Sequence, residues 1–223
     1  FLKKLQTDKK INYTVHAQYL NGSLNDLNDK IREETIKLIY QSIDNAKKIN
    51  AKIVTIHPAL EPYGLRLKIR EQLELDSYKK IAAYAKSKNI KIGLENEAQT
   101  CFWFPDRACQ FDLLDQTIRA VDQPNFGLTL DIGHSSVSGQ SCLRALTKFN
   151  KKIFHIHAHD NLGAPEKNLA IFNRPDPHKA PGEGKVDWQA VVKTLKQIKY
   201  NNYFELECEI HQMTEAIEYI KGL

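Results

Sequence analysis

Five apolar segments of this 223-residue chain end in a histidine, an aspartate or a glutamate. Each segment is dense in Ile, Val, Leu or Phe, which is typical of a buried strand. Imidazole nitrogens and carboxylate oxygens are the ligands that zinc and similar divalent metals bind. One such strand end means little, but five predict a metal centre where the strand ends converge. The five residues are His57, Glu95, Asp131, His157 and Glu207.

Further ligand-type residues extend this set. His16 ends an earlier strand-like segment, His134 follows Asp131 closely, and a long polar loop contains Asp176 and His178. The last two are two positions apart, so in an extended segment their side chains point to the same side. A glutamate that closes an apolar strand would otherwise be a costly buried charge. The predicted metal ligands are therefore His16, His57, Glu95, Asp131, His134, His157, Asp176, His178 and Glu207.

Strand and helix patterns alternate along the chain, which predicts a parallel sheet with helices outside. No Gly-x-Gly-x-x-Gly turn follows the first strand, so the dinucleotide-binding fold is disfavoured. Ligand-type residues at many strand ends favour a closed barrel. We expect one α/β domain over residues 1–223, a (β/α)8 TIM barrel. The expected strands are 11–16, 53–57, 90–95, 126–131, 153–157 and 203–207, and the expected helices are 25–50, 69–88, 111–121, 141–149, 187–199 and 213–221.

The strand count is short of eight. Six strands are clear, and a seventh could lie in the loop near Ile171. Residues 1–6 have the pattern of a helix end, so a complete barrel would need a strand before Phe1. We therefore expect the first strand to be missing from this chain. The length suits a single domain with one sizeable core.

Composition and charge indicate the cellular compartment of the protein and its possible partners. The net charge of +5 is mildly basic and compatible with phosphorylated or nucleic-acid ligands, without deciding between them. The four cysteines form no Cys-x-x-Cys pair, so free thiols in a reducing compartment are expected. We find neither a signal peptide nor an apolar run long enough to cross a bilayer. These features predict a cytoplasmic protein without a membrane partner, and they leave the oligomeric state open.

Several short motifs together carry a family resemblance. They are His-Ala-x-Tyr-Leu at 16–20, Ile-His-Pro at 56–58, Leu-Glu-Asn-Glu at 94–97, Leu-Asp-Ile-Gly-His at 130–134, His-Ala-His-Asp-Asn at 157–161 and Asp-x-His-x-x-Pro-Gly-Glu-Gly at 176–184. With the terminal Leu-Glu at 206–207, the chain resembles the xylose isomerase-like barrels. That superfamily contains sugar isomerases and epimerases, and also the endonuclease IV-type nucleases that cut at apurinic sites.

The resemblance implies how the ligands would be shared among one to three divalent ions. In the nuclease pattern Glu95 would bridge two ions, the first also held by His16 and His57. Asp131, His157 and Glu207 would complete the second, and His134, Asp176 and His178 would hold the third. The epimerases use mainly Glu95, Asp131, His157 and Glu207. Zinc is the expected metal, with manganese as the alternative.

The first functional hypothesis is a sugar or sugar-phosphate isomerase or epimerase. The metal would polarise the carbonyl of the sugar as a Lewis acid, and Glu95 or Glu207 would be the catalytic carboxylate that moves the proton. Trp103 and Phe104 lie in an aromatic segment that follows the third predicted strand, where they could cap a small sugar. Further predicted substrate-binding residues are Tyr19 and His159.

The alternative is a phosphodiesterase that cuts abasic DNA with a trinuclear zinc cluster. The nine candidate ligands favour it, and Tyr19 and Leu20 match positions that the nucleases use near DNA. The segment 99–103 counts against it, because the nucleases carry a Gly-rich loop there. More basic residues beside the mouth would also be expected. The sequence therefore favours a small sugar as partner. A third hypothesis is a barrel that has a binding role alone.

Overall fold

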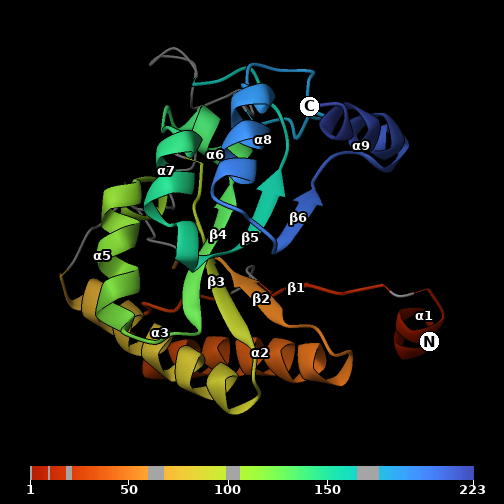
Figure 1. Ribbon diagram of the computed structural model, residues 1–223. Coiled ribbons are helices and arrows are strands. Elements are labelled where there is room, and N and C mark those ends of the chain that lie inside the picture. Colours follow the sequence, from red (N-terminus) through yellow and green to blue (C-terminus); the bar gives the residue numbers. More distant parts are fainter. Residues whose placement is uncertain (1, 10, 19–21, 60–67, 99–105, 165–175) are drawn as a thin grey trace.

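The strands of the protein form one parallel sheet. The computed structural model describes residues 2–9, 11–18, 22–59, 68–98, 106–164 and 176–223 (Figure 1). Within these residues the sheet has six strands in the order of the sequence, which form a half-barrel. The strands are β1 (Val15–His16), β2 (Ile53–Ile56), β3 (Lys91–Glu95), β4 (Phe126–Asp131), β5 (Ile153–Ala158) and β6 (Tyr203–Leu206).

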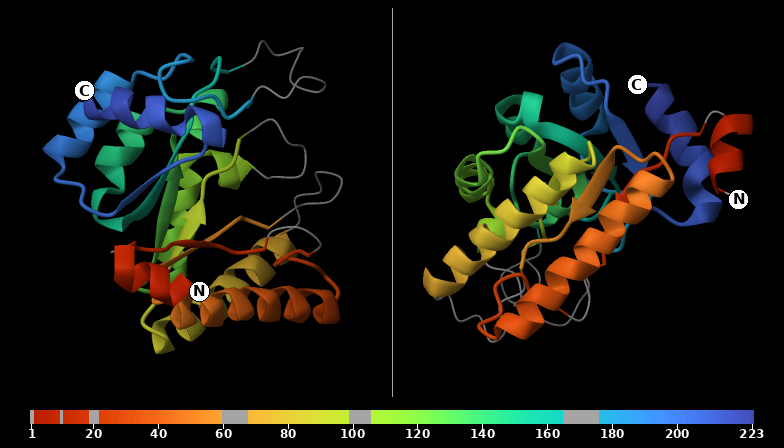
Figure 2. Two further views of the ribbon diagram at one scale, coloured as in Figure 1. Left: turned by 90° about the vertical axis from the view of Figure 1, so that its right-hand side faces the viewer. Right: turned by 90° about the horizontal axis from the view of Figure 1, so that it is seen from below.

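Helices connect the strands and cover the outer face of the sheet. Figure 2 shows α2 and α3 lying side by side, and α7 packs on α8. The helices are α1 (Leu2–Lys9), α2 (Asp29–Lys48), α3 (Lys68–Ser87), α4 (Asp106–Cys109), α5 (Phe111–Val121), α6 (Ile132–Val137), α7 (Cys142–Lys148), α8 (Trp188–Gln197) and α9 (Met213–Lys221), with 3-10 turns at Asn150–Lys152 and Ile210–Gln212.

Local sequence explains where several helices begin and which face they bury. The Asn28 side chain accepts a hydrogen bond from the Lys30 backbone N–H and begins α2, and Asp187 does the same for α8 through Ala190. The inward face of α2 repeats at helical spacing and packs against β2, whose residues are all buried. The buried residues of α2 are Ile36, Ile39, Ile43 and Ala46.

The predicted alternation of strands and helices is confirmed, and the fold is a partial (β/α)8 barrel. The strand expected over 11–16 is shorter, because only Val15 and His16 pair with β2. Helix α6 was not predicted; it starts directly after β4, where the Asp131 side chain accepts from the backbone N–H of His134 at 2.7 Å. The proposed strand near Ile171 lies outside the described residues. None of the described helices is long and apolar enough to span a membrane.

Strand register sets the position of the ligand-type residues. Asp131 pairs directly with His157 across β4 and β5, and Glu95 pairs with Thr129 across β3 and β4. Glu207 continues β6, and its backbone N–H donates to the carbonyl of Ala158 at 3.0 Å. Because all strands are parallel, these residues emerge at the same edge of the sheet.

Candidate metal centre

The central group of the centre comes from four adjacent strand ends. Glu95, Asp131, His157 and Glu207 each place one ligand-type atom within 4.8 Å of the others. Nδ1 of His157 lies 2.9 Å from Oε1 of Glu95 and 3.1 Å from Oε1 of Glu207. Glu95, Asp131 and His157 are buried, whereas the Glu207 side chain keeps 24% of its surface exposed. Of the four, Glu207 is therefore the one most open to a ligand arriving from solvent.

A second group shares Glu95 and adds two histidines. Nε2 of His16 and Nε2 of His57 lie 3.1 Å apart, and they are 3.2 and 3.3 Å from Oε2 of Glu95. Two imidazole nitrogens at this distance need a shared proton or a cation between them. A tetrahedral ion with bonds of about 2.1 Å separates its ligand atoms by about 3.4 Å. The three atoms therefore fit a zinc-like ion.

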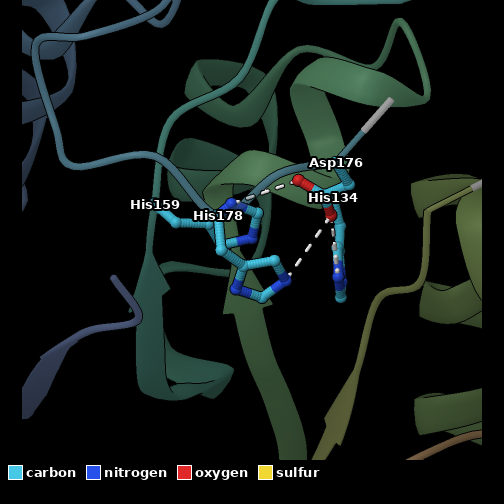
Figure 3. A group of neighbouring side chains, drawn as sticks. All are labelled: His134, His159, Asp176 and His178. Atoms are coloured by element: carbon cyan, nitrogen blue, oxygen red, sulfur yellow. Dashed lines mark ion pairs between the residues drawn. The ribbon is translucent and has the colours of Figure 1, made fainter. Parts of the chain in front are cut away.

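The third group joins α6, the end of β5 and the loop before α8 (Figure 3). It contains His134, His159, Asp176 and His178, whose ligand-type atoms also lie within 4.8 Å of one another. Oδ2 of Asp176 is 3.3 Å from Nε2 of His134 and 3.8 Å from Nε2 of His178. The rings of His159 and His178 stack 3.8 Å apart at an interplanar angle of 8°. This donor set also fits a divalent metal, because it consists of imidazoles and a carboxylate.

His159 links the third group to the central one. Its Nε2 lies 3.0 Å from Oδ1 of Asp131, and its Nδ1 lies 3.2 Å from Oδ1 of Asp176. The ring is fully buried, and a Cβ on Gly133 would come within 2.0 Å of it, so only glycine fits there. His159 thus contacts two predicted ligands, and its predicted part in substrate binding stays a prediction.

Burial and neighbouring charges shift the pKa values of the carboxyl groups in opposite directions. Burial raises the pKa of Glu95, but His157 and the other histidines around it outweigh burial and hold it well below its usual value. Asp131 behaves similarly: despite burial, His134 and His159 lower its pKa to about 2. Burial raises the pKa of Glu207 to about 7; His157 opposes this shift, whereas Asp131 and Glu95 add to it.

Three of the buried histidines have raised pKa values in the metal-free protein. Burial lowers each pKa, but the facing carboxylates raise it more: to about 11 for His57 beside Glu97, to about 10 for His134 beside Asp131, and to about 9 for His157. A metal that binds these nitrogens must therefore displace protons.

A polar layer lies one step deeper between the strands. Nε2 of His155 is 3.1 Å from Oε2 of Glu205, which also accepts a hydrogen bond from the Thr14 hydroxyl at 3.2 Å. Thr55 Oγ1 lies 3.3 Å from Nδ1 of His155 and 2.9 Å from the hydroxyl of Thr129. Burial lowers the pKa of His155, whereas the pKa of the neighbouring His157 is raised. The His155 ring is therefore neutral more readily than the His157 ring.

The Asp160 carboxylate organises the loop that follows Asp176 and His178. It is fully buried and accepts hydrogen bonds from the backbone N–H groups of Asn161, Gly182 and Val186 and from the indole N–H of Trp188, at 2.8 to 3.1 Å. The backbone of Asp160 also pairs with that of Lys179, next to His178. These contacts hold the third group of ligands against the end of β5.

The structure brings all nine predicted metal ligands together in the three groups. The predicted substrate residues Tyr19, Trp103 and Phe104 lie outside the described residues, as does Leu20.

Sequence reasoning missed the two residues that follow Glu95. Asn96 holds the end of β4, since its side chain donates to the Asp131 carbonyl at 2.9 Å and accepts from the Asp131 N–H at 2.8 Å. The motif Leu-Glu-Asn-Glu contained both this residue and Glu97.

Comparison with known proteins identifies the family. Residues 2–223 match the protein family described as Xylose isomerase-like TIM barrel. The chain belongs to this family. The resemblance predicted from the motifs is thereby confirmed for the fold and the superfamily. The uncharacterized protein MJ1311 of Methanocaldococcus jannaschii is 26% identical over 211 residues, which are 93% of this chain and 68% of that protein.

Relatives and solved structures with named activities extend this comparison. The inosose dehydratase of Clostridium perfringens is 24% identical over 137 residues, which are 58% of this chain and 44% of that enzyme. A D-tagatose 3-epimerase-like protein matches with a TM-score of 0.87 and 25% identity, over 99% of this chain and 80% of that one. The IolI protein, solved with a zinc atom, matches with a TM-score of 0.76 and 22% identity, over 99% of this chain and 79% of that one.

Proposed function

We propose that the chain is a divalent-metal-dependent isomerase or epimerase that acts on a small sugar or sugar phosphate. The observation that carries this proposal is the pair Glu95 and Glu207, which contact the same histidine at the mouth of the half-barrel. The similarity to a D-tagatose 3-epimerase-like protein and to inosose dehydratases supports a sugar-type substrate.

The two carboxylates suit proton transfer at a carbon next to a carbonyl. Glu207 is partly exposed and follows a strand at the edge of the sheet, so a substrate can approach it. Glu95 is buried and held by His157 and His16, so its oxygens keep a fixed direction. Glu207 would remove or return the proton, and Glu95 would orient the opposite side of the substrate. Alternatively, Glu95 would transfer the proton and Glu207 would orient the substrate.

The metal proposal rests on the donor set. A bound divalent ion, with zinc expected and manganese as the alternative, would polarise the substrate carbonyl. Glu95, Asp131, His157 and Glu207 would hold the ion nearest the reaction, and the groups around His57 and His134 could hold two more. The zinc atom in the IolI protein supports this choice.

Abasic DNA is the less favoured partner. In the sequence, the nine candidate ligands favoured a nuclease as the alternative hypothesis. The proteins above whose names give an activity are an inosose dehydratase and a D-tagatose 3-epimerase-like protein, and these names do not favour phosphodiester cleavage.

The test is solvent exchange at the substrate carbon. The metal-loaded chain is incubated in D₂O with ketopentoses, ketohexoses, their phosphates and inosose, and proton NMR follows deuterium entry next to the carbonyl. Incorporation with formation of an epimer or isomer is expected for at least one sugar, with Glu207→Gln as the inactive control. Cleavage of an abasic-site duplex without any exchange into sugars would overturn the proposal.

A further inference from the structure

Three histidines of the metal centre are oriented by the backbone. Nδ1 of His16 donates to the carbonyl of Ala17 at 2.9 Å, Nδ1 of His134 to that of Asn96 at 2.8 Å, and Nδ1 of His178 to that of Glu207 at 3.2 Å. A carbonyl oxygen only accepts, so Nδ1 carries a proton and Nε2 is the nitrogen through which each ring can bind a metal. In each case Nε2 faces a carboxylate of the centre, at 3.2 to 3.8 Å.

His57 has the same orientation but a different partner. Its Nε2 faces Oε2 of Glu95 at 3.3 Å, as the pattern requires. Its Nδ1, however, lies 2.9 Å from Oε1 of Glu97. A full carboxylate therefore stands where the other three histidines have a backbone carbonyl.

Glu97 is held firmly in this position. Only 5% of its surface is exposed, although it lies two residues beyond the end of β3. Its backbone N–H donates to the carbonyl of Ala108 at 2.8 Å, and its carbonyl accepts from the Ser138 hydroxyl at 3.3 Å. Within the described part of the chain, His57 is the residue that forms an ion pair with it. A buried carboxylate is costly unless a partner compensates it, and no lysine or arginine does so among these residues.

We propose that Glu97 is a positioning residue that holds His57 with its Nε2 directed at Glu95, so that the His16–His57–Glu95 group binds a divalent metal more tightly. A carboxylate on the outer nitrogen of a metal-binding histidine fixes the tautomer and raises the basicity of the inner nitrogen. The carboxylate also adds a negative charge beside a group whose own carboxylate, Glu95, is shared with the central group. This inference rests on the metal centre of the proposed function.

The test measures metal binding and needs no substrate. Zinc affinity is determined by competition with a chromophoric chelator, and cobalt binding by its visible absorption spectrum. Removal of such an outer carboxylate typically weakens metal binding by about 10- to 100-fold. We expect Glu97→Gln to lower the metal affinity by this factor for one of the bound ions. Glu97→Asp keeps the charge but withdraws it from Nδ1, so it should also weaken binding, and circular dichroism confirms that each variant folds.

A double variant separates positioning from a general charge effect. If Glu97 acts through His57, Glu97→Gln combined with His57→Ala binds metal no more weakly than His57→Ala alone. Asp112→Asn is the control, because this carboxylate pairs with Arg144 and Lys148 at the surface and belongs to none of the candidate metal groups among the described residues. Its zinc affinity should stay close to that of the parent chain.

Two results would overturn the inference. The first is a parent chain that binds zinc tightly and a folded Glu97→Gln variant with the same affinity; this leaves the proposed function intact. The second is an additive loss in the double variant, which would mean that Glu97 acts independently of His57. A parent chain that binds no divalent metal at all would instead overturn the proposed metal centre, and this inference with it.

Discussion

Glu95 and Glu207 contact the same imidazole nitrogen, although β4 and β5 lie between their strands in the sheet. Glu95 ends β3 and Glu207 follows β6, and their Oε1 atoms lie 2.9 and 3.1 Å from Nδ1 of His157. Curvature of the sheet brings the two carboxylates to one point, as expected for strands that surround a barrel. The arrangement places a fixed, buried carboxylate and a partly exposed one at the same site.

Metal binding should stabilise the fold. We expect zinc to raise the midpoint of thermal unfolding, because the four central ligands come from the ends of four strands, β3 to β6, which unfolding separates. A free ion concentration of one hundred times Kd contributes about 2.7 kcal/mol, which corresponds to a rise of roughly 5–10 °C for a chain of this length. Differential scanning calorimetry with zinc and with excess chelator measures this, and identical midpoints would contradict it.

Metal affinity should rise with pH between about 6.5 and 9. In the metal-free protein the pKa of His157 is raised to about 9 and that of His134 to about 10, so these rings are protonated at neutral pH. Because their folded-state pKa values exceed the unfolded value, their protonation stabilises the metal-free fold below about pH 6.5, and this stabilisation is lost as the pH rises through 9 to 10.

Metal must displace those protons, so its affinity should increase by about tenfold per pH unit for each proton released. Calorimetric titration in buffers of different ionisation enthalpy counts the protons directly. The difference in thermal midpoint between loaded and metal-free protein should grow over the same pH range. An affinity that does not change with pH would contradict the protonation states described here.

Replacement of Glu207 should abolish turnover while the chain still folds. Glu207→Gln keeps the size of the side chain but removes the base, and loss of a general base typically costs about 10²- to 10⁴-fold in rate. The measurement is the rate of deuterium entry into the sugar, with metal content checked for each preparation. Asp112→Asn, at the surface beside Arg144 and Lys148, is the control and should retain the activity of the parent chain. Full activity in Glu207→Gln would remove Glu207 from the proposed chemistry.

Asp160 should be important for stability. Asp160→Ala leaves four N–H donors without their acceptor, and two of them, the Asn161 backbone N–H and the Trp188 indole N–H, are buried. We expect a loss of about 2–4 kcal/mol in the free energy of unfolding. Asp112→Ala is the comparison: this exposed carboxylate pairs with Arg144 and Lys148 at the surface, and its removal should change the free energy of unfolding much less than Asp160→Ala does. Urea unfolding of both variants checks the difference.

The sequence by itself determined the alternation of strands and helices and the candidate ligands. Apolar runs mark buried strands locally, and parallel strands must place their carboxyl ends at one edge of the sheet. For that reason the residue types and their positions along the chain were enough to predict His57, Glu95 and His157 at the same mouth. Short elements with little periodic signal were beyond this reasoning, and α6, which begins on the side chain of Asp131, is an example.

Only the tertiary structure decided which atoms of those residues meet. That Glu97 turns inward to Nδ1 of His57, and that His159 lies between Asp131 and Asp176, depends on packing between elements far apart in the sequence. Residue type and spacing specify what a side chain can donate or accept. The neighbours it finds depend on strand register, helix packing and burial, and these arise from the whole core at once.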